Sequence, residues 1–323
     1  MTHRNFVIFF LGIILAVSCA KPPPAARPGA FNFFPPDDKG GFVDQVWLVN
    51  TAMANMAQKH LVEGGPKETV RIPILCALVR HGSEYFLIDT GLNHNFAFKP
   101  ADYMGKFTFF IAKMVREMPT MSKGQDVVAQ ITRMGLIPEQ ITKIVLTHAH
   151  FDHTGELQAF PKAQVLIGPG ETKFIQRAFG ETHGVLKKDF SWDAIKELSF
   201  TDTKPFLTFT GSLDLFPDKS VTIVPTPGHT PGSISVYVRT KQAQFLFCGD
   251  AAYAPVNIEK PVNTGYNDNP PISWETIERL HDLHSAMPGL KIITFHDPAF
   301  ADVPYDTPMP LVEETPKSPA PQK

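Results

Sequence analysis

Short apolar runs that end at glycine or at a polar turn recur through the middle of the chain, and this pattern predicts buried strands. The predicted strands cover residues 72–79, 85–88, 143–146, 164–167, 221–224, 234–238, 245–247 and 291–294. Apolar residues at helical spacing predict one helix over 126–134, which ends before Gly135, and another over 274–286 with Ser273 as its N-cap. Strands that are mixed with helices predict a layered α/β fold.

The two ends of the chain are rich in proline and lack this periodicity. Their composition predicts an extended tether over 20–42 and a disordered tail over 304–323. One folded domain is therefore expected over 43–303. Within it, residues 93–122 form an insert rich in phenylalanine and methionine. The insert is equally consistent with the wall of an apolar substrate pocket and with a core helix or a dimer contact.

Composition adds three expectations. The chain has 323 residues, of which 43% are hydrophobic, so it can bury a large core. Its net charge of −2 shows no basic bias, which argues against a nucleic-acid partner. Cys76 and Cys248 both lie in predicted strands, and we expect two buried thiols rather than a disulfide.

The first 19 residues are typical of a secretory signal. Arg4 precedes an apolar run over 6–17, which is short for a membrane span of about 20 residues. Small residues leading to Cys19 resemble the lipobox of bacterial lipoproteins, and an acylated Cys19 would anchor the protein to a membrane. The alternative is an ordinary signal cut near Ala20. Both interpretations predict export, to the periplasm or as a membrane-anchored lipoprotein, and the lack of aspartate after Cys19 favours the outer membrane.

Side chains that commonly bind metals follow several of the predicted strands directly. They are His148, His150, Asp152, His153, His229, Asp250 and His296. In layered α/β folds the carboxyl ends of strands form the rim where ligands bind. Imidazole and carboxylate groups suit zinc and similar divalent ions. Packing explains the dense run from His148 to His153 poorly, because each buried polar group would need its own partner. We therefore predict a two-metal site in which Asp250 bridges ions about 3.5–4 Å apart.

The run His148-Ala149-His150-Phe151-Asp152-His153 resembles the hallmark of the metallo-β-lactamase superfamily. The resemblance implies a four-layer αββα sandwich over 43–303 that holds two divalent ions, zinc or alternatively iron, cobalt or manganese. It assigns the ligands to one ion bound by His148, His150 and His229 and another bound by Asp152, His153 and His296, with Asp250 shared. It also implies that Asp89 braces the metal loop from outside. The alternative for Asp89 is an Asx turn before Gly91.

Tyr253, three residues after Asp250, and the pair His296-Asp297 resemble the N-acyl-homoserine lactonase branch of that superfamily, which is known for quorum quenching. This resemblance implies a small-molecule substrate with a lactone or ester. It implies that Tyr253 donates a hydrogen bond to the developing oxyanion and that Asp152 delivers a proton to the departing oxygen. The alternative for Tyr253 is a ring in the core with its hydroxyl at the surface.

Other members of the superfamily fit less well. Glyoxalase II-like thioesterases share the ligands but carry a helical glutathione-binding domain where this chain has its Pro-rich tail. True metallo-β-lactamases generally lack a counterpart of Asp250, and flavodiiron proteins use a glutamate within the motif. Phosphodiesterases often place basic residues around the site. A lipoprotein that only binds a metal or ligand is the non-enzymatic alternative. We predict an exported metal-dependent hydrolase, and the sequence leaves a homodimer open.

Overall fold

The computed structural model describes residues 31–106, 118–177 and 183–313. Within these ranges the strands form two sheets, one of seven strands in the order β12-β1-β2-β3-β4-β5-β6 and one of five in the order β11-β10-β9-β8-β7. The first sheet contains β1 (Gln45–Ala57), β2 (Thr69–His81), β3 (Glu84–Ile88), β4 (Ile141–Val145), β5 (Gln164–Ile167), β6 (Ile195–Glu197) and β12 (Met309–Pro310). The second contains β7 (Leu213–Asp214), β8 (Val221–Pro225), β9 (Ile234–Arg239), β10 (Gln244–Gly249) and β11 (Leu290–Thr294).

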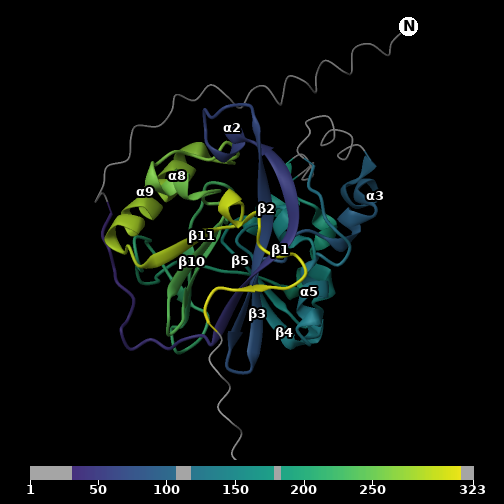
Figure 1. The fold of residues 1–323 in the computed structure, drawn as a ribbon. Helices are drawn as coiled ribbons and strands as arrows, with labels where there is room; N and C mark the ends of the chain where they lie inside the picture. Colours follow the sequence, from purple (N-terminus) through teal and green to yellow (C-terminus); the bar gives the residue numbers. More distant parts are fainter. Residues whose placement is uncertain (1–30, 107–117, 178–182, 314–323) are drawn as a thin grey trace, which may run out of the picture.

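Helices flank the two sheets on opposite sides, as Figure 1 shows for α9 on the left and α5 on the right. The α-helices are α2 (Gln58–Leu61), α3 (Pro100–Met104), α5 (Val127–Arg133), α6 (Phe151–Thr154), α7 (Glu171–Gln176), α8 (Pro255–Glu259) and α9 (Pro270–Ala286). Short 3-10 helices connect them at His94–Ala97, Pro138–Gln140, Leu157–Ala159, Lys187–Asp189, Trp192–Ala194 and Pro298–Phe300. In the described part of the chain, no helix has the length and hydropathy needed to cross a membrane.

The layers follow from the alternation of side chains along the strands, in which successive residues face opposite sides of the sheet. Leu48 of β1 lies in the core between the sheets together with Val236 of β9. The next residue towards the N-terminus, Trp47, faces the other way and belongs to the core under α5 with Ile131. Leu280 of α9 lies in a third core on the outer face of the second sheet. Helix, sheet, sheet and helix therefore stack in the order αββα, as predicted.

The predicted strands are confirmed as β2 to β5 and β8 to β11. The predicted helix over 126–134 is α5, with the Asp126 side chain accepting from the amide of Ala129. The prediction that Ser273 caps α9 is wrong. Asn269 caps this helix, which begins at Pro270, because proline is well suited to the first turn. The Ser273 hydroxyl donates to Asn267 Oδ1 instead, at 2.9 Å.

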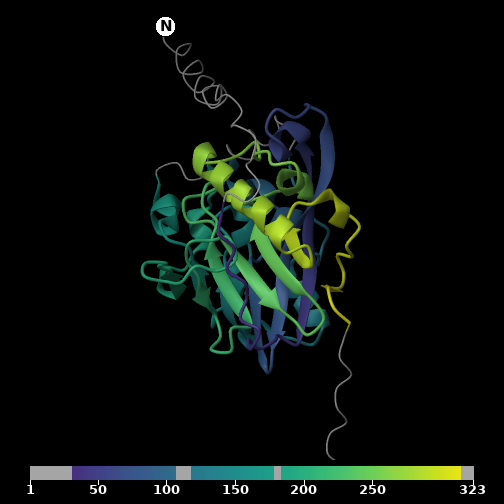
Figure 2. The same cartoon turned by 90° about the vertical axis from the view of Figure 1, so that its left-hand side faces the viewer.

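The structure corrects the predicted tether over 20–42 in its described part, residues 31–42. From residue 31 onwards the segment is docked on the domain, on the side that carries α9 (Figure 2). The amide of Phe31 donates to Asp282 Oδ2 at 3.0 Å, and Phe34 exchanges backbone hydrogen bonds with Leu207. The Arg279 guanidinium lies 4.0 Å from the centroid of the Phe31 ring. Aromatic and hydrogen-bonding contacts thus hold a segment whose proline content indicated an extended spacer.

The structure also corrects the predicted disordered tail in its described part, residues 304–313. Residues of β12 pair with β1, the amide of Leu311 donates to Val46 O at 2.9 Å, and Val312 is buried in the core between the sheets. Backbone pairing to an edge strand and burial of an apolar side chain explain the docking. Residues 314–323 lie outside the described residues. So do residues 1–30 with Cys19, and the signal and the anchor stay predictions.

The insert over 93–122 contributes to a small core in its described part. Phe96, Tyr103 and Met104 are buried together with Leu92 and Leu186. Residues 107–117 lie outside the described residues, so a role in a substrate pocket stays a prediction. The expectation for the cysteines is confirmed, because Cys76 and Cys248 are free and buried.

Candidate metal centre

The predicted ligands meet where strands of both sheets end. His148 and His150 follow β4, Asp152 and His153 lie on α6, and His229, Asp250 and His296 follow β8, β10 and β11. The loops approach each other closely. A Cβ atom at Gly249, which has a φ of 51°, would lie 2.4 Å from Thr147 Oγ1, so only glycine fits there. The two sheets therefore bring the end of β10 into direct contact with the loop that follows β4.

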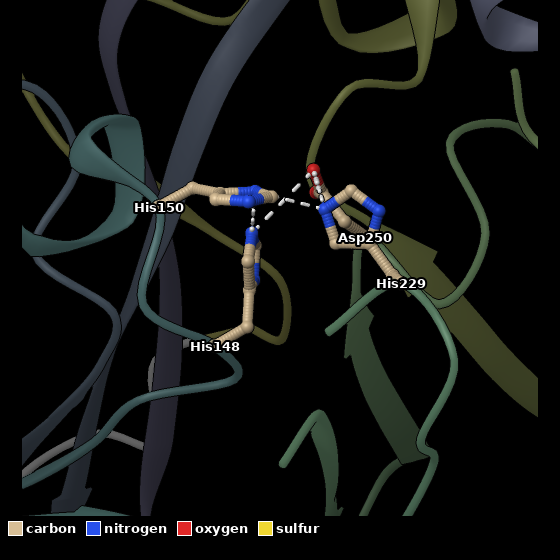
Figure 3. A group of neighbouring side chains, drawn as sticks. All are labelled: His148, His150, His229 and Asp250. Carbon is tan, nitrogen blue, oxygen red and sulfur yellow. Dashed lines mark hydrogen bonds and ion pairs between the residues drawn. The ribbon is translucent and has the colours of Figure 1, made fainter. Parts of the chain in front are cut away.

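One group of ligand atoms is formed by His148, His150, His229 and Asp250 (Figure 3). His150 Nδ1 lies 3.0 Å from Nε2 of both His148 and His229. Asp250 Oδ2 lies 3.4 Å from His229 Nε2 and 3.7 Å from His148 Nε2. Tetrahedral ligands about 2.0–2.1 Å from a zinc ion are about 3.3–3.4 Å apart. These four residues are called the first group below. Their spacing fits a single divalent ion.

The second group is formed by Asp152, His153 and His296. Asp250 Oδ1 lies 3.3 Å from His153 Nε2 and 3.2 Å from His296 Nε2. Asp152 Oδ2 lies 3.8 Å and 3.4 Å from the same two nitrogens. The two oxygens of Asp250 thus face different groups, which is the geometry of a bridging carboxylate.

Two buried polar atoms without a hydrogen bond in the described part of the chain indicate that these residues fit metal ions. His153 Nε2 and Asp250 Oδ1 are buried, and neither makes a hydrogen bond within the described residues. Buried polar atoms in native proteins nearly always have a partner. An ion in the second group would be the partner of both atoms, and imidazole with carboxylate is the donor set that zinc and similar ions prefer.

The second nitrogen of each histidine ring is held from outside the site. The contacts are His148 Nδ1 with Thr147 Oγ1 at 3.1 Å, His153 Nδ1 with Asp89 Oδ2 at 2.7 Å, His229 Nδ1 with Tyr266 O at 2.7 Å, His296 Nδ1 with Pro73 O at 2.9 Å, and His150 with the backbone of His183. A carbonyl oxygen can only accept, so His229 and His296 donate from Nδ1. When these rings are neutral, the lone pair is on Nε2 and points into the site, as metal binding requires.

Asp89 lies where a residue that orients the metal-binding loop from outside is expected. Its carboxylate accepts hydrogen bonds from the amide of Thr147 at 2.6 Å and from the Thr147 hydroxyl at 2.7 Å, in addition to its contact with His153. The side chain is fully buried and faces the metal-binding loop, not the turn before Gly91. Burial raises the pKa of Asp89, and His153 opposes that rise.

The two groups differ in their electrostatics. Burial lowers the pKa of His148 and His150 well below the usual value, so both rings are neutral and ready to bind an ion. Burial would also lower the pKa of His153, but the carboxylates of Asp250 and Asp152 raise it well above its usual value. An ion that binds in the second group must therefore displace a proton.

Tyr253 lies beside both groups. Its ring centroid is 5.7 Å from that of His229 and 5.4 Å from that of His296. The side chain is buried, so the alternative of a hydroxyl at the surface is wrong. Burial and the neighbouring carboxylates of Asp250 and Asp152 raise the pKa of Tyr253 well above its usual value. The phenol stays protonated at neutral pH and can donate a hydrogen bond.

Glu171, at the start of α7, was missed by the sequence analysis. Its carboxylate accepts from the amide of Ala149 at 2.8 Å, the amide of Gly232 at 2.8 Å and the hydroxyl of Thr230 at 2.9 Å. Burial raises the pKa of Glu171 to about 7, although these hydrogen bonds oppose the rise. One signal was available, because Glu171 follows a predicted strand on the same rim as the ligands.

Known proteins share this fold and part of this sequence. The family model of the metallo-beta-lactamase superfamily matches residues 70–287. The N-acyl homoserine lactonase AttM of Azorhizobium caulinodans is 26% identical over 230 residues, which are 70% of this chain and 82% of that protein. The N-acyl homoserine lactonase AiiA of Bacillus thuringiensis subsp. kurstaki is 26% identical over 219 residues, 68% of this chain and 79% of the relative.

Solved structures show the same fold. An N-acyl homoserine lactone hydrolase with N-hexanoyl-L-homoserine at its catalytic metal center superposes with a TM-score of 0.66 at 21% identity, over 80% of this chain and 94% of that one. AidC, a dizinc quorum-quenching lactonase, gives a TM-score of 0.57 at 15% identity, over 81% of this chain and 92% of that one. Since the family model spans more than half of the chain and the fold agrees with it, this protein is a metal-dependent hydrolase that belongs to the metallo-beta-lactamase superfamily.

Proposed function

We propose that this chain is a dinuclear-metal hydrolase that opens lactone rings, with N-acyl homoserine lactones as its leading substrates. The observation that carries the proposal is the buried phenol of Tyr253 beside both histidine groups and Asp250. The lactonase relatives reported above support it, as does a similar structure that holds N-hexanoyl-L-homoserine at its metal center.

The residues of the site divide the chemistry between them. Two divalent ions, with zinc as the leading candidate, would lower the pKa of a bound water to about 7 and polarise the substrate carbonyl. Tyr253 donates a hydrogen bond to the carbonyl oxygen as negative charge develops on it. Asp152 is the more exposed carboxylate of the site, with 19% of its side chain accessible, and it takes the proton that the attacking water releases and delivers it to the departing ring oxygen.

A substrate panel tests the reaction class. The zinc-loaded enzyme is assayed side by side with N-acyl homoserine lactones, simple lactones, glutathione thioesters, β-lactams and phosphodiesters. We expect the lactones to have the highest kcat/KM. Much faster turnover of a thioester, a β-lactam or a phosphodiester would overturn the lactonase proposal and leave the hydrolase fold intact.

We further propose that the protein is exported and anchored through an acylated Cys19. The charged residue Arg4, the apolar run over 6–17 and the small residues before Cys19 support this proposal. Mass spectrometry of the mature N-terminus should find lipid on Cys19. An unmodified N-terminus at Ala20 would contradict the anchor while leaving export in place.

A further inference from the structure

Glu171 is a buried carboxylate that the proposed reaction does not use. It lies at the first position of α7 and is 0% exposed. Its surroundings are built tightly around it, because a Cβ atom at Gly232 would lie 2.7 Å from Glu171 Oε2. An ionised carboxylate in such a place is unfavourable unless its oxygens accept several hydrogen bonds.

The hydrogen bonds of Glu171 go to two separate loops. Oε1 accepts from the amide of Ala149, the residue between His148 and His150. Oε2 accepts from the hydroxyl of Thr230, the residue after His229, and from the amide of Gly232 in the same turn. One side chain therefore joins the two segments that carry all three histidines of the first group.

A different carboxylate, that of Asp89, orients a ligand of the second group. Asp89 contacts the ring of His153 directly, and no hydrogen bond joins Glu171 to Asp152, His153 or His296 within the described residues. The two groups also differ in the number of carboxylates that they contain. The first group shares the anion of Asp250 and has no carboxylate of its own, whereas the second group has Asp152 as well.

We propose that Glu171 is the positioning residue of the first group, and that loss of its carboxylate weakens metal binding there selectively. The inference rests on the dinuclear centre of the proposed function. A residue that orients metal ligands from outside typically contributes ~10–100-fold to metal affinity. Glu171 does so by fixing the distance between the loop of His148 and His150 and the loop of His229.

The variant Glu171→Gln tests this role with little change in shape. An amide has one acceptor oxygen and one NH₂ donor, so at least one of the three donors around it loses its partner. Glu197→Gln is the matched control. Glu197 accepts from the amides of Gly170 and Thr172, which flank Glu171 at the start of the same helix, but its side chain is exposed and contacts neither metal loop.

Zinc content and stepwise zinc affinity are measured for the full chain by elemental analysis and by competition with a chelator of known affinity. We expect two tightly bound ions in the wild type and in Glu171→Gln one tight ion and one bound ~10–100-fold more weakly. Glu197→Gln should match the wild type. The assignment is overturned if Glu171→Gln keeps both affinities or loses both ions to the same degree, since the second result indicates a general structural role.

A milder variant covers the case in which Glu171→Gln does not fold. Thr230→Val removes one of the three hydrogen bonds and should weaken the same single binding step by a smaller factor, and wild-type affinities in this variant would overturn the assignment. The proposed function fails in a different way. Fewer than two ions in the wild type would refute the dinuclear centre and this role together, whereas a two-ion wild type without lactonase activity would refute only the substrate.

Discussion

Asp89 holds the ring of His153 through a 2.7 Å contact between Oδ2 and Nδ1, and both side chains are completely buried. Asp89 also has a φ of 60°, a left-handed conformation that aspartate tolerates better than most residues. A strained backbone and a buried charge thus occur together at a residue that binds no metal itself. Such strain is typical of functional sites. Here its effect is to aim His153 Nε2 into the second group.

Asp89→Asn should therefore weaken the ion of the second group more than that of the first, the reverse of the result expected for Glu171→Gln. Some effect on the first group follows from the hydrogen bonds of Asp89 to Thr147, whose hydroxyl contacts His148 Nδ1. Asparagine keeps the shape and tolerates the same φ, but it removes the charge that holds His153. We expect a ~10–100-fold loss in one step of zinc affinity. Asp202→Asn is the matched control, because Asp202 has a φ of 59° and is exposed. Equal weakening of both steps in Asp89→Asn would contradict this division of roles.

Asp250→Ala should abolish tight binding of both ions. Its two oxygens lie 3.2–3.4 Å from histidine nitrogens of different groups, so one truncation removes a ligand from each. Elemental analysis after dialysis against metal-free buffer should find less than one ion per chain. Asp193→Ala, at an exposed position, should retain the wild-type content. Retention of one tight ion by Asp250→Ala would show that the carboxylate is not shared.

Tyr253→Phe should lower kcat for lactones and leave the zinc content unchanged. The phenol is expected to act mainly in the transition state, so KM should change less than kcat. Loss of an oxyanion donor typically reduces the rate by ~10²–10³, and a neighbouring ion would make the loss smaller. Steady-state kinetics of Tyr253→Phe and of Tyr305→Phe, whose side chain is exposed, measure the effect. An unchanged kcat would exclude Tyr253 from the reaction.

Asp189 should make stability depend on pH. Its carboxylate accepts a hydrogen bond from Tyr103 Oη at 2.7 Å, and burial raises its pKa to about 7. An unfolded aspartate ionises near pH 4, so between about pH 4 and pH 7 the folded state binds the extra proton and stability falls as the pH rises. Above pH 7 both states are ionised and the effect levels off.

Asp189→Asn removes this titration, so its stability relative to the wild type should rise between pH 5 and pH 8. The interval between the two pKa values sets an upper limit of ~4 kcal/mol. Urea unfolding of both proteins at saturating zinc measures the difference at each pH. Asp193→Asn should show no such trend, because Asp193 is exposed. A difference that falls with rising pH would contradict the raised pKa of Asp189.

Most strands, and the seven candidate ligands that the structure brings together, could be predicted from the sequence because each is visible locally, as an apolar run followed by a polar group. Strand β1 could not, since Asn50 and Thr51 interrupt its apolar pattern. The Asn50 amide is buried but donates to Val303 O at 3.1 Å, 253 residues away. A buried polar residue whose hydrogen-bond partner lies so far away in the sequence looks, from its neighbours alone, like part of a loop.

Glu171 was missed for a related reason. Its partners are 22, 59 and 61 residues away, and only the folded chain brings them together. Asp89 follows the predicted strand over 85–88, and the family resemblance assigned it its role. Residues that position ligands act through tertiary contacts, whereas the ligands themselves follow the ends of strands and form a recognisable run.

The docked segment at residues 31–42 changes what a lipid on Cys19 would mean for the enzyme. The folded body includes Phe31, which is held by Asp282 and Arg279, and so extends beyond the predicted start at Val43. The twelve residue steps from Cys19 to Phe31 span at most ~40 Å even when fully extended. An anchored enzyme would therefore keep Phe31, beside α9, within ~40 Å of the bilayer. It would meet amphiphilic substrates as they leave or enter the lipid, instead of sampling the whole compartment.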